Sequence, residues 1–428
     1  MVKRRTVRSG LAVTAALCAI AALPGTAAAD PGDLPAYAVA EDAEPVEGHE
    51  SSTGGPALEP GTYTDTIGPG EKKYYSVPLD DRSNAWISAV ARPGPGVRVA
   101  YGDGIKVALQ APDGTTCGES DINFGSEDAA RPIADHAWRI IKPDGNCQQS
   151  RVYHFSVERR SAATSHPSPW PVEIRFMQEP GLKSITSTTP PEEPGKTPSP
   201  SGPPMGETRP VKGGTGFNDA AGMGEGNWSD RLRPGETRFY RVPLDWGQRL
   251  HVNLEFGTAK AKEGGYVSGA FRVDLYNPAR GHVVGESAGY RPDKPAELPL
   301  ASVPVDFTNR YDSSARLGNT GFAGWYYIAV YAHRHLTDSV SGSVPVVLRT
   351  SVEGSAKPAP DYDGDAVAAG FGVTEKDREA AARGQSAAEA ETSGTMRTVA
   401  WVGIGAGTVL LLGLGLWTLI ARRSGGPR

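Results

Sequence analysis

Short segments in which apolar and polar residues alternate recur along the middle of the chain. Residues 105–109, 250–256 and 271–275 each alternate with a period of two, which is the period of a β-strand with one buried face. Gly and Pro punctuate these segments, and a Pro-Gly-Glu turn signal stands before two of the strands. No amphipathic helical stretch interrupts them. The pattern predicts an all-β protein built from antiparallel β-sandwiches.

The chain also contains an internal repeat. Residues 69–71, Pro-Gly-Glu, and residues 75–80, Tyr-Ser-Val-Pro-Leu-Asp, reappear 165 positions later as Pro-Gly-Glu and Tyr-Arg-Val-Pro-Leu-Asp. The match continues with small insertions as far as Arg175 and Arg349, in the same order in both copies. We interpret this as a duplicated domain. The predicted fold is therefore two tandem, jelly-roll-like β-sandwiches, residues 56–180 and 212–352.

These motifs resemble one known family. In each copy a Tyr-x-Val-x-Leu strand follows Pro-Gly-Glu, a Val-x-Leu-x-x-Pro strand comes next, and the second copy ends in Gly-Trp-Tyr-Tyr-Ile-Ala-Val at residues 324–330. This is similar to the bacterial pre-peptidase C-terminal (PPC) domain, a β-sandwich appended to secreted peptidases. The resemblance covers both copies and implies an extracellular, non-catalytic accessory or binding module. No peptidase domain stands beside the copies.

Both ends of the chain read as targeting segments. A basic start, an apolar run over residues 11–23 and three alanines form a secretory signal, so we expect residues 1–29 to be removed by cleavage between Ala29 and Asp30. Residues 398–421 carry no charge and are long enough to span a bilayer, and two arginines follow them. We therefore predict a transmembrane helix, a cytoplasmic tail at 422–428, and a single-pass type I protein of the cell membrane with an extracellular ectodomain.

Three segments lack the strand pattern. Residues 30–55 are acidic and are expected to be disordered. Residues 181–211 are rich in Pro, Ser and Thr and are expected to form an extended linker. Residues 353–397 are expected to form a polar stalk, with a weak helix from 375 to 391.

The charge of the chain excludes one class of partner. The net charge is −5. Setting aside the eight basic residues in the signal and around the membrane segment leaves 36 basic and 49 acidic residues, a net charge of −13. Nucleic-acid-binding domains are typically basic, so no nucleic acid is expected. The expected partner is an extracellular protein, peptide or glycan, and the sequence does not distinguish among these.

Cys117 and Cys147 are the two cysteines of the mature chain, and both lie in the first copy. Outside the cell the compartment is oxidising, which favours a disulfide. In the chain-entropy model such a bridge stabilises the fold by about 3–4 kcal/mol. Two cysteines are too few for a structural zinc site, and the C-x-x-C spacing of a redox pair is missing.

Other motifs with chemical meaning are incomplete. Residues 285–289, Gly-Glu-Ser-Ala-Gly, match a nucleophile elbow, but the prolines that follow exclude the helix that an elbow needs. His333 and His335 share a strand face without a third metal ligand. Residues 361–365 begin like a calcium loop but Gly372 stands where its final Glu belongs. We therefore predict no catalytic residue, no metal, no cofactor and no enzymatic activity.

Trp246 is the candidate ligand contact. It lies in the predicted turn Asp-Trp-Gly-Gln at residues 245–248, where an exposed indole can stack on a sugar or peptide; a packed Trp is the alternative. We interpret the chain as a binding protein without catalysis. A structural stalk or spacer, and an accessory subunit of a secreted or membrane enzyme, remain alternatives.

Gly403 and Gly407 form a G-x-x-x-G pair on one face of the predicted membrane helix. Two helices can approach closely at such a face. The pair is therefore the candidate interface of a homodimer, with a monomeric anchor as the alternative.

Overall fold

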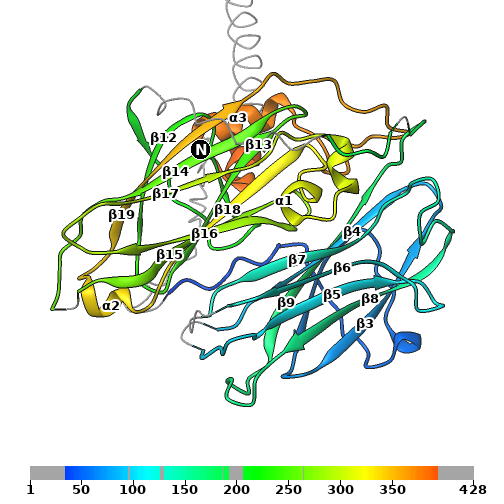
Figure 1. The fold of residues 1–428 in the computed structure, drawn as a ribbon, viewed down its shortest axis with the longest axis horizontal. Coiled ribbons are helices and arrows are strands. Elements are labelled where there is room, and N and C mark those ends of the chain that lie inside the picture. Colours follow the sequence, from blue (N-terminus) through cyan, green and yellow to red (C-terminus); the bar gives the residue numbers. More distant parts are fainter. Residues whose placement is uncertain are drawn as a thin grey trace, which may run out of the picture. The chain divides into compact units, whose positions relative to one another are not determined.

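Residues 34–393 are described in the computed structural model, apart from 95–96, 126–129, 186, 192–205 and 264. All the strands and helices below belong to one compact unit that begins at Pro35 (Figure 1). The predicted cleavage site, Ala29 and Asp30, and the predicted membrane helix with Gly403 and Gly407 lie outside the described residues and stay predictions. Among the residues described, no helix is long and apolar enough to cross a membrane.

The first repeat folds into two sheets. One has the strand order β1-β2-β9-β4-β7 and the other β3-β8-β5-β6. The first sheet contains β1 (Glu44–Pro45), β2 (Gly61–Ile67), β9 (Trp170–Glu179), β4 (Asn84–Ala91) and β7 (Ile133–Arg139), and the second contains β3 (Lys72–Leu79), β8 (Arg151–Arg160), β5 (Gly104–Gln110) and β6 (Thr116–Asn123). Between them lies a core that includes Tyr75, Ile87, Phe155 and Trp170.

The second repeat has the same plan. One sheet has the order β10-β12-β19-β14-β17 and the other β11-β13-β18-β15-β16. Their bounds are β10 (Thr208–Pro210), β12 (Gly226–Leu232), β19 (Val344–Glu353), β14 (Arg249–Phe256), β17 (Ala296–Ala301), β11 (Ala221–Gly222), β13 (Thr237–Leu244), β18 (Gly324–Ala332), β15 (Val267–Tyr276) and β16 (His282–Tyr290). Short helical turns connect some strands: η1 (Ser52–Gly54), η2 (Phe307–Tyr311), α1 (Ala315–Gly318) and α2 (Leu336–Ser339).

The all-β prediction is confirmed, and the alternating segments 105–109, 250–256 and 271–275 lie in β5, β14 and β15. Corresponding strands occupy corresponding places in the two repeats. β12 and β13 begin 165 positions after β2 and β3, as the aligned sequences require. The described strands of each repeat form sheets only with one another. The boundaries of the two sandwiches themselves stay a prediction.

The repeat begins earlier than we expected. Residues 34–55 were expected to be disordered, but β1 pairs in parallel with β2, and His49 forms a bridge with Tyr74. The same pairings recur 165 positions later, where β10 pairs with β12 and Gly214 with Phe239. The described part of this segment is therefore held by backbone hydrogen bonds, which need no apolar alternation. A shared Pro-Val-x-Gly, at residues 45–48 and 210–213, is the signal that the alignment overlooked.

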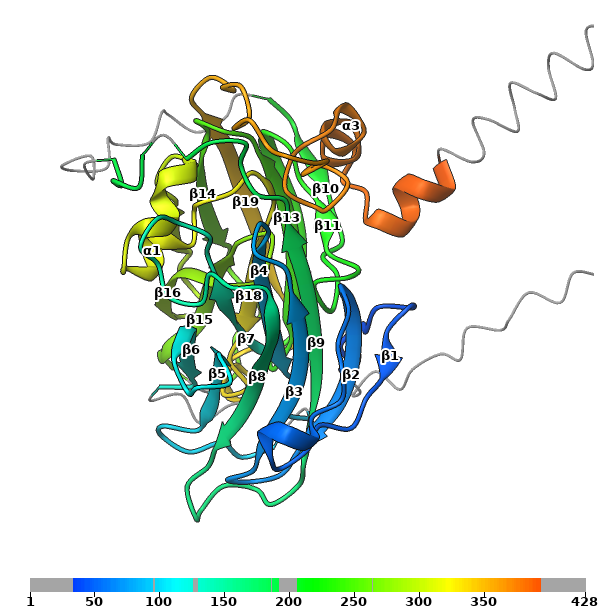
Figure 2. The ribbon, with the colours of Figure 1, turned by 90° about the vertical axis from the view of Figure 1, so that its right-hand side faces the viewer.

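The prediction of a polar stalk after residue 352 is also wrong for the described residues. Tyr362 and Phe371 are buried, and both belong to the apolar cluster of the second repeat. The weak helix is present as α3 (Glu375–Arg383), which packs against β11 and β13 (Figure 2). A capping box between Thr374 and Asp377 starts it, and Gly384 ends it in the left-handed conformation. A few well-placed apolar residues are enough to dock a segment that is polar on average.

The two repeats are joined by a buried junction. On β9, Glu173, Met177 and Glu179 point away from the core of the first repeat and are nevertheless buried. Met177 and Trp86 of β4 belong to the same apolar cluster as the core of the second repeat. The outer face of the β2-β9-β4 sheet is therefore the interface with the second repeat, and the candidate groove opens beside it.

Candidate functional site

The predicted contact residue Trp246 is not on the surface. Only 4% of its area is exposed, and it packs in the apolar cluster of the second repeat beside Phe307. The segment after β19 covers the turn, since the backbone N–H of Lys357 donates to the carbonyl of Trp246 at 2.8 Å. The expectation of an exposed indole is therefore wrong. Its physical reason is the docking of a segment that the sequence pattern assigned to a stalk.

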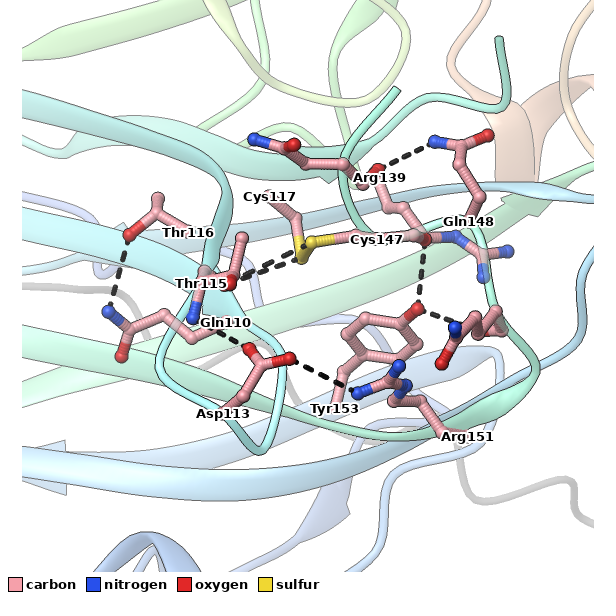
Figure 3. Close-up of a disulfide and its surroundings, with 12 residues drawn as sticks. Gln110, Asp113, Thr115, Thr116, Cys117, Arg139, Cys147, Gln148, Arg151 and Tyr153 are labelled. Carbon is pink, nitrogen blue, oxygen red and sulfur yellow. Dashed lines mark hydrogen bonds and ion pairs between the residues drawn. A yellow bond between two sulfur atoms is a disulfide. The ribbon is translucent and has the colours of Figure 1, made fainter. Parts of the chain in front are cut away.

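The predicted disulfide between Cys117 and Cys147 is confirmed (Figure 3). It joins the start of β6 to the loop between β7 and β8. The same loop is held by Tyr153, whose hydroxyl donates to the carbonyl oxygens of Cys147 at 2.8 Å and Gln149 at 2.7 Å. The disulfide and the Tyr153 hydroxyl therefore hold the same loop, which is a structural role.

The other sequence motifs with chemical meaning occupy structural positions. Residues 285–289 lie within β16, a strand paired with β15, so Ser287 does not stand at a strand-to-helix turn. Gly289 leaves room for the hydroxyl of Tyr266, which a Cβ atom would meet at 1.9 Å. His333 and His335 lie beyond the end of β18 at Ala332, so they do not share a strand face as expected; their rings stack with the centroids 4.8 Å apart. No group of three or more His, Cys, Asp or Glu residues in the described part of the chain is placed to hold a metal ion.

A groove with a volume of about 1050 Å³ opens beside the junction of the two repeats. Its walls come from the start of β2, the β3–β4 turn, the last residues of β9 and the segment 180–185. The second repeat contributes Asn218 and Phe307, and the docked segment after β19 contributes Asp363 and Ala369. The groove therefore exists only when the two repeats and that segment are assembled.

Buried ion pairs fix the groove walls. Arg280 of the second repeat pairs with Glu173 of the first, and both side chains are fully buried. Asn218 also donates to Glu173, at 3.0 Å. Burial alone raises the pKa of Glu173, but Arg280 and Asn218 more than offset it and hold that pKa below its usual range. The carboxylate thus stays charged and ties the two repeats together beside the groove.

Both signs of charge line the groove. Asp80 is satisfied internally: it accepts hydrogen bonds from Ser83 and Gln178. Lys183 pairs with Asp361 at 2.7 Å. Arg175 of β9 is different, because no ion pair joins it to any described carboxylate; its charged and polar neighbours are Arg280, Tyr327 and Glu173. Burial and the nearby Arg280 both lower the pKa of Arg175.

Two exposed tyrosines escaped the sequence analysis. Tyr101 is 83% exposed and Tyr266 61% exposed. They lie 165 positions apart, close before β5 and β15 respectively. Their shared place in the two repeats is the sequence signal that marks them. Each of these two loops is an alternative ligand-binding surface, which an experiment has to distinguish from the groove.

No protein-family model and no curated protein matches the chain. The similarity to the PPC domain therefore stays a prediction. Several solved structures align at low identity. The tandem CBM22-1-CBM22-2 domain of Paenibacillus barcinonensis Xyn10C is 9% identical, with 66% of this chain and 82% of that one covered and a TM-score of 0.19.

The extracellular domain of Arabidopsis thaliana ANXUR2 is 9% identical over 71% of this chain and 86% of that one, with a TM-score of 0.20. The CUB1-EGF-CUB2 domain of human MASP-1/3 is 7% identical over 68% and 99%, with a TM-score of 0.17. At these scores the likenesses carry no argument about what the chain does.

Proposed function

We propose that this chain is a cell-surface binding protein whose two β-sandwiches hold a ligand, without catalysis, in the groove beside their junction. The observation that carries the proposal is the composition of the groove, which takes residues from both repeats and from the docked segment after β19. A groove of about 1050 Å³ is at the upper end of the range for small-ligand sites. It is also large enough for a short stretch of a polymer.

The cellular setting of the proposal rests on the sequence. The secretory signal and the uncharged segment 398–421 support a single-pass type I protein with residues 30–397 outside the cell. The Cys117–Cys147 disulfide is compatible with an oxidising compartment. Each repeat is proposed to be a jelly-roll-like module similar to the PPC domain, used as a binding module.

A binding screen on the full-length chain, captured through a C-terminal tag, tests the proposal. The probes are a glycan array and a library of random hexapeptides. We expect ligands from these probes to bind, and Ala369→Trp, which fills the groove, to weaken them at least about ten-fold, because a blocked site loses the contacts that bury the ligand. Ala163→Trp, at an exposed loop position, is the matched control.

Three results would count against binding in the groove. Ligands that bind the Ala369→Trp chain unchanged would place the site elsewhere. Loss of binding on changing both Tyr101 and Tyr266 to Ala would assign it to the exposed loops. A failure of every glycan and peptide to bind would favour a spacer, a role that the buried ion pairs across the junction also suit.

A further inference from the structure

The duplication provides an internal comparison for Arg175, which lines the groove. Arg175 lies between Thr62 of β2 and Ser88 of β4 in the sheet register. Arg349 holds the corresponding place in the second repeat, between Asn227 of β12 and Asn253 of β14. The two arginines are therefore equivalent positions of one fold, and their surroundings can be compared directly.

The equivalent arginine in the second repeat has a partner within its own sheet. Arg349 forms an ion pair with Glu255 at 2.6 Å and donates to the side-chain oxygen of Asn227 at 3.2 Å. Glu255 stands two residues beyond Asn253 on β14, and the residue two beyond Ser88 on β4 is Val90. The carboxylate that neutralises the arginine in one repeat is thus replaced by an apolar side chain in the other.

No described carboxylate forms an ion pair with Arg175. Glu173, two residues earlier on β9, attracts Arg175 through space, but its carboxylate forms its ion pair with Arg280. Ser88, directly across the strand pair from Arg175, is fully buried, and its hydroxyl has no hydrogen-bond partner among the described residues. A half-buried guanidinium that forms no ion pair keeps part of its desolvation cost, so an anion supplied from outside would offset that cost.

We infer that Arg175 receives a carboxylate of the ligand that the proposed groove binds, and that this ligand is a peptide with a free carboxyl terminus. The inference rests on the proposed function. Arginine is suited to the task because its planar fork donates two parallel hydrogen bonds to one carboxylate. Tyr327 of the second repeat lies beside the guanidinium of Arg175.

The other groups in the groove favour a peptide over a polyanion. Four aspartates line it, Asp42, Asp80, Asp81 and Asp363, against the basic Arg82, Arg175 and Lys183, of which Lys183 is paired with Asp361. The predicted ectodomain carries a net charge of −13. A polymer with one negative charge per repeating unit would be repelled along most of its length. A peptide presents a single terminal carboxylate to Arg175 and neutral amides or an ammonium group to the aspartates.

Binding of two hexapeptide libraries to the full-length chain tests the inference, one library with free carboxyl termini and the other with amidated termini. We expect the free-acid peptides to bind about ten- to hundred-fold more tightly, the effect of one hydrogen-bonded charge pair. Arg175→Gln is expected to abolish this preference, and Arg175→Lys to keep part of it. Arg349→Gln, the matched change in the other repeat, is expected to leave it unchanged.

Equal affinity of the acid and the amide for the wild-type chain would overturn the inference, even if Arg175→Gln failed to fold. So would a preference that survives in folded Arg175→Gln. Binding of glycans but of no peptide would overturn it and leave the proposed function standing. If neither glycans nor peptides bind, the proposed function fails as well.

Discussion

Glu179, at the end of β9, joins three separate parts of the chain. Its carboxylate accepts two hydrogen bonds from Arg310 of the second repeat, at 2.5 and 2.9 Å. It also accepts one from Tyr362 of the docked segment, at 2.6 Å, and others from Asn84 and Trp86 of its own repeat. All these bonds are buried, so the residue acts as a polar anchor for the junction.

Glu179→Gln is expected to destabilise the chain by about 3–5 kcal/mol, because it leaves the buried guanidinium of Arg310 without a counter-charge. Chemical denaturation measures the loss. Glu158→Gln removes a half-exposed pair with Lys72 and is expected to cost less than about 1 kcal/mol. Similar losses in the two variants would show that Glu179 does not carry the junction.

His136 makes the junction sensitive to acid. Its ring is fully buried between Trp86 and Trp138, and its Nε2 hydrogen-bonds to Asn277 of the second repeat. Burial lowers the pKa of His136, and the neighbouring Asp135 only partly opposes this. The folded chain therefore binds fewer protons here than the unfolded chain, whose His titrates near a pKa of about 6.5.

Stability is expected to fall as the pH is lowered through about 6.5, because His136 then binds a proton in the unfolded state but not in the folded state. His251, whose pKa burial also lowers, adds to the slope of the wild type. Denaturation midpoints between pH 5 and 8 should therefore show a shallower slope for His136→Gln than for the wild type. An unchanged slope for His136→Gln would rule out His136 as a source of the pH dependence.

At the scale of elements, the segment after β19 is part of the folded body. Phe371 is 1% exposed, and its ring lies 5.6 Å from that of Phe322, centroid to centroid. Phe371→Ala is expected to cost about 3–5 kcal/mol of unfolding free energy. Val367→Ala, four residues earlier at an exposed position, is the control and should change stability by less than about 0.5 kcal/mol.

Equal, small effects of the two substitutions would show that the segment does not pack on the folded body and is a stalk. The comparison also bears on the groove, since Asp363 and Ala369 of this segment form part of its wall. A loosely attached segment would leave the groove open on that side.

The strands could be predicted because they leave a periodic record. Residues 105–109 place a large apolar side chain at every second position, Ile105, Val107 and Leu109, and all three are buried. β1 and the segment after β19 leave no such record, because two-residue strands and single buried aromatics have no period. Trp246 was misplaced for this reason: the segment that covers it is distant in the sequence.

The site was harder to predict than the fold. Arg175 and Arg349 could be aligned from the sequence, but their different environments depend on Val90 and Glu255 on a neighbouring strand. Val90 and Glu255 stand 165 positions apart, the offset of the repeat, but the sequence does not show that their strands lie beside the two arginines. The groove depends on how the repeats pack, through Glu173 and Arg280, which are 107 positions apart. No local pattern records such a contact.

At the scale of the whole molecule, the duplication has produced two repeats with similar folds and different roles. The polar cluster around Asp65 is repeated around Asp230: each carboxylate accepts a tyrosine hydroxyl and a glycine N–H. These shared contacts maintain the fold. Other contacts differ between the repeats, such as the ion pair that neutralises Arg349 and has no equivalent in the first repeat. These differences lie on the face where the first repeat meets the second and where the groove opens.

Hydrogen–deuterium exchange on the full-length chain, with and without a peptide selected from the free-acid library, tests binding in the groove most directly. Binding in the groove predicts slower exchange in the segments 60–62, 80–84, 175–185 and 363–369, because these segments contain residues that line the groove. The loops that carry Tyr101 and Tyr266 should exchange as before. Protection confined to those loops, with the groove segments unchanged, would contradict the account.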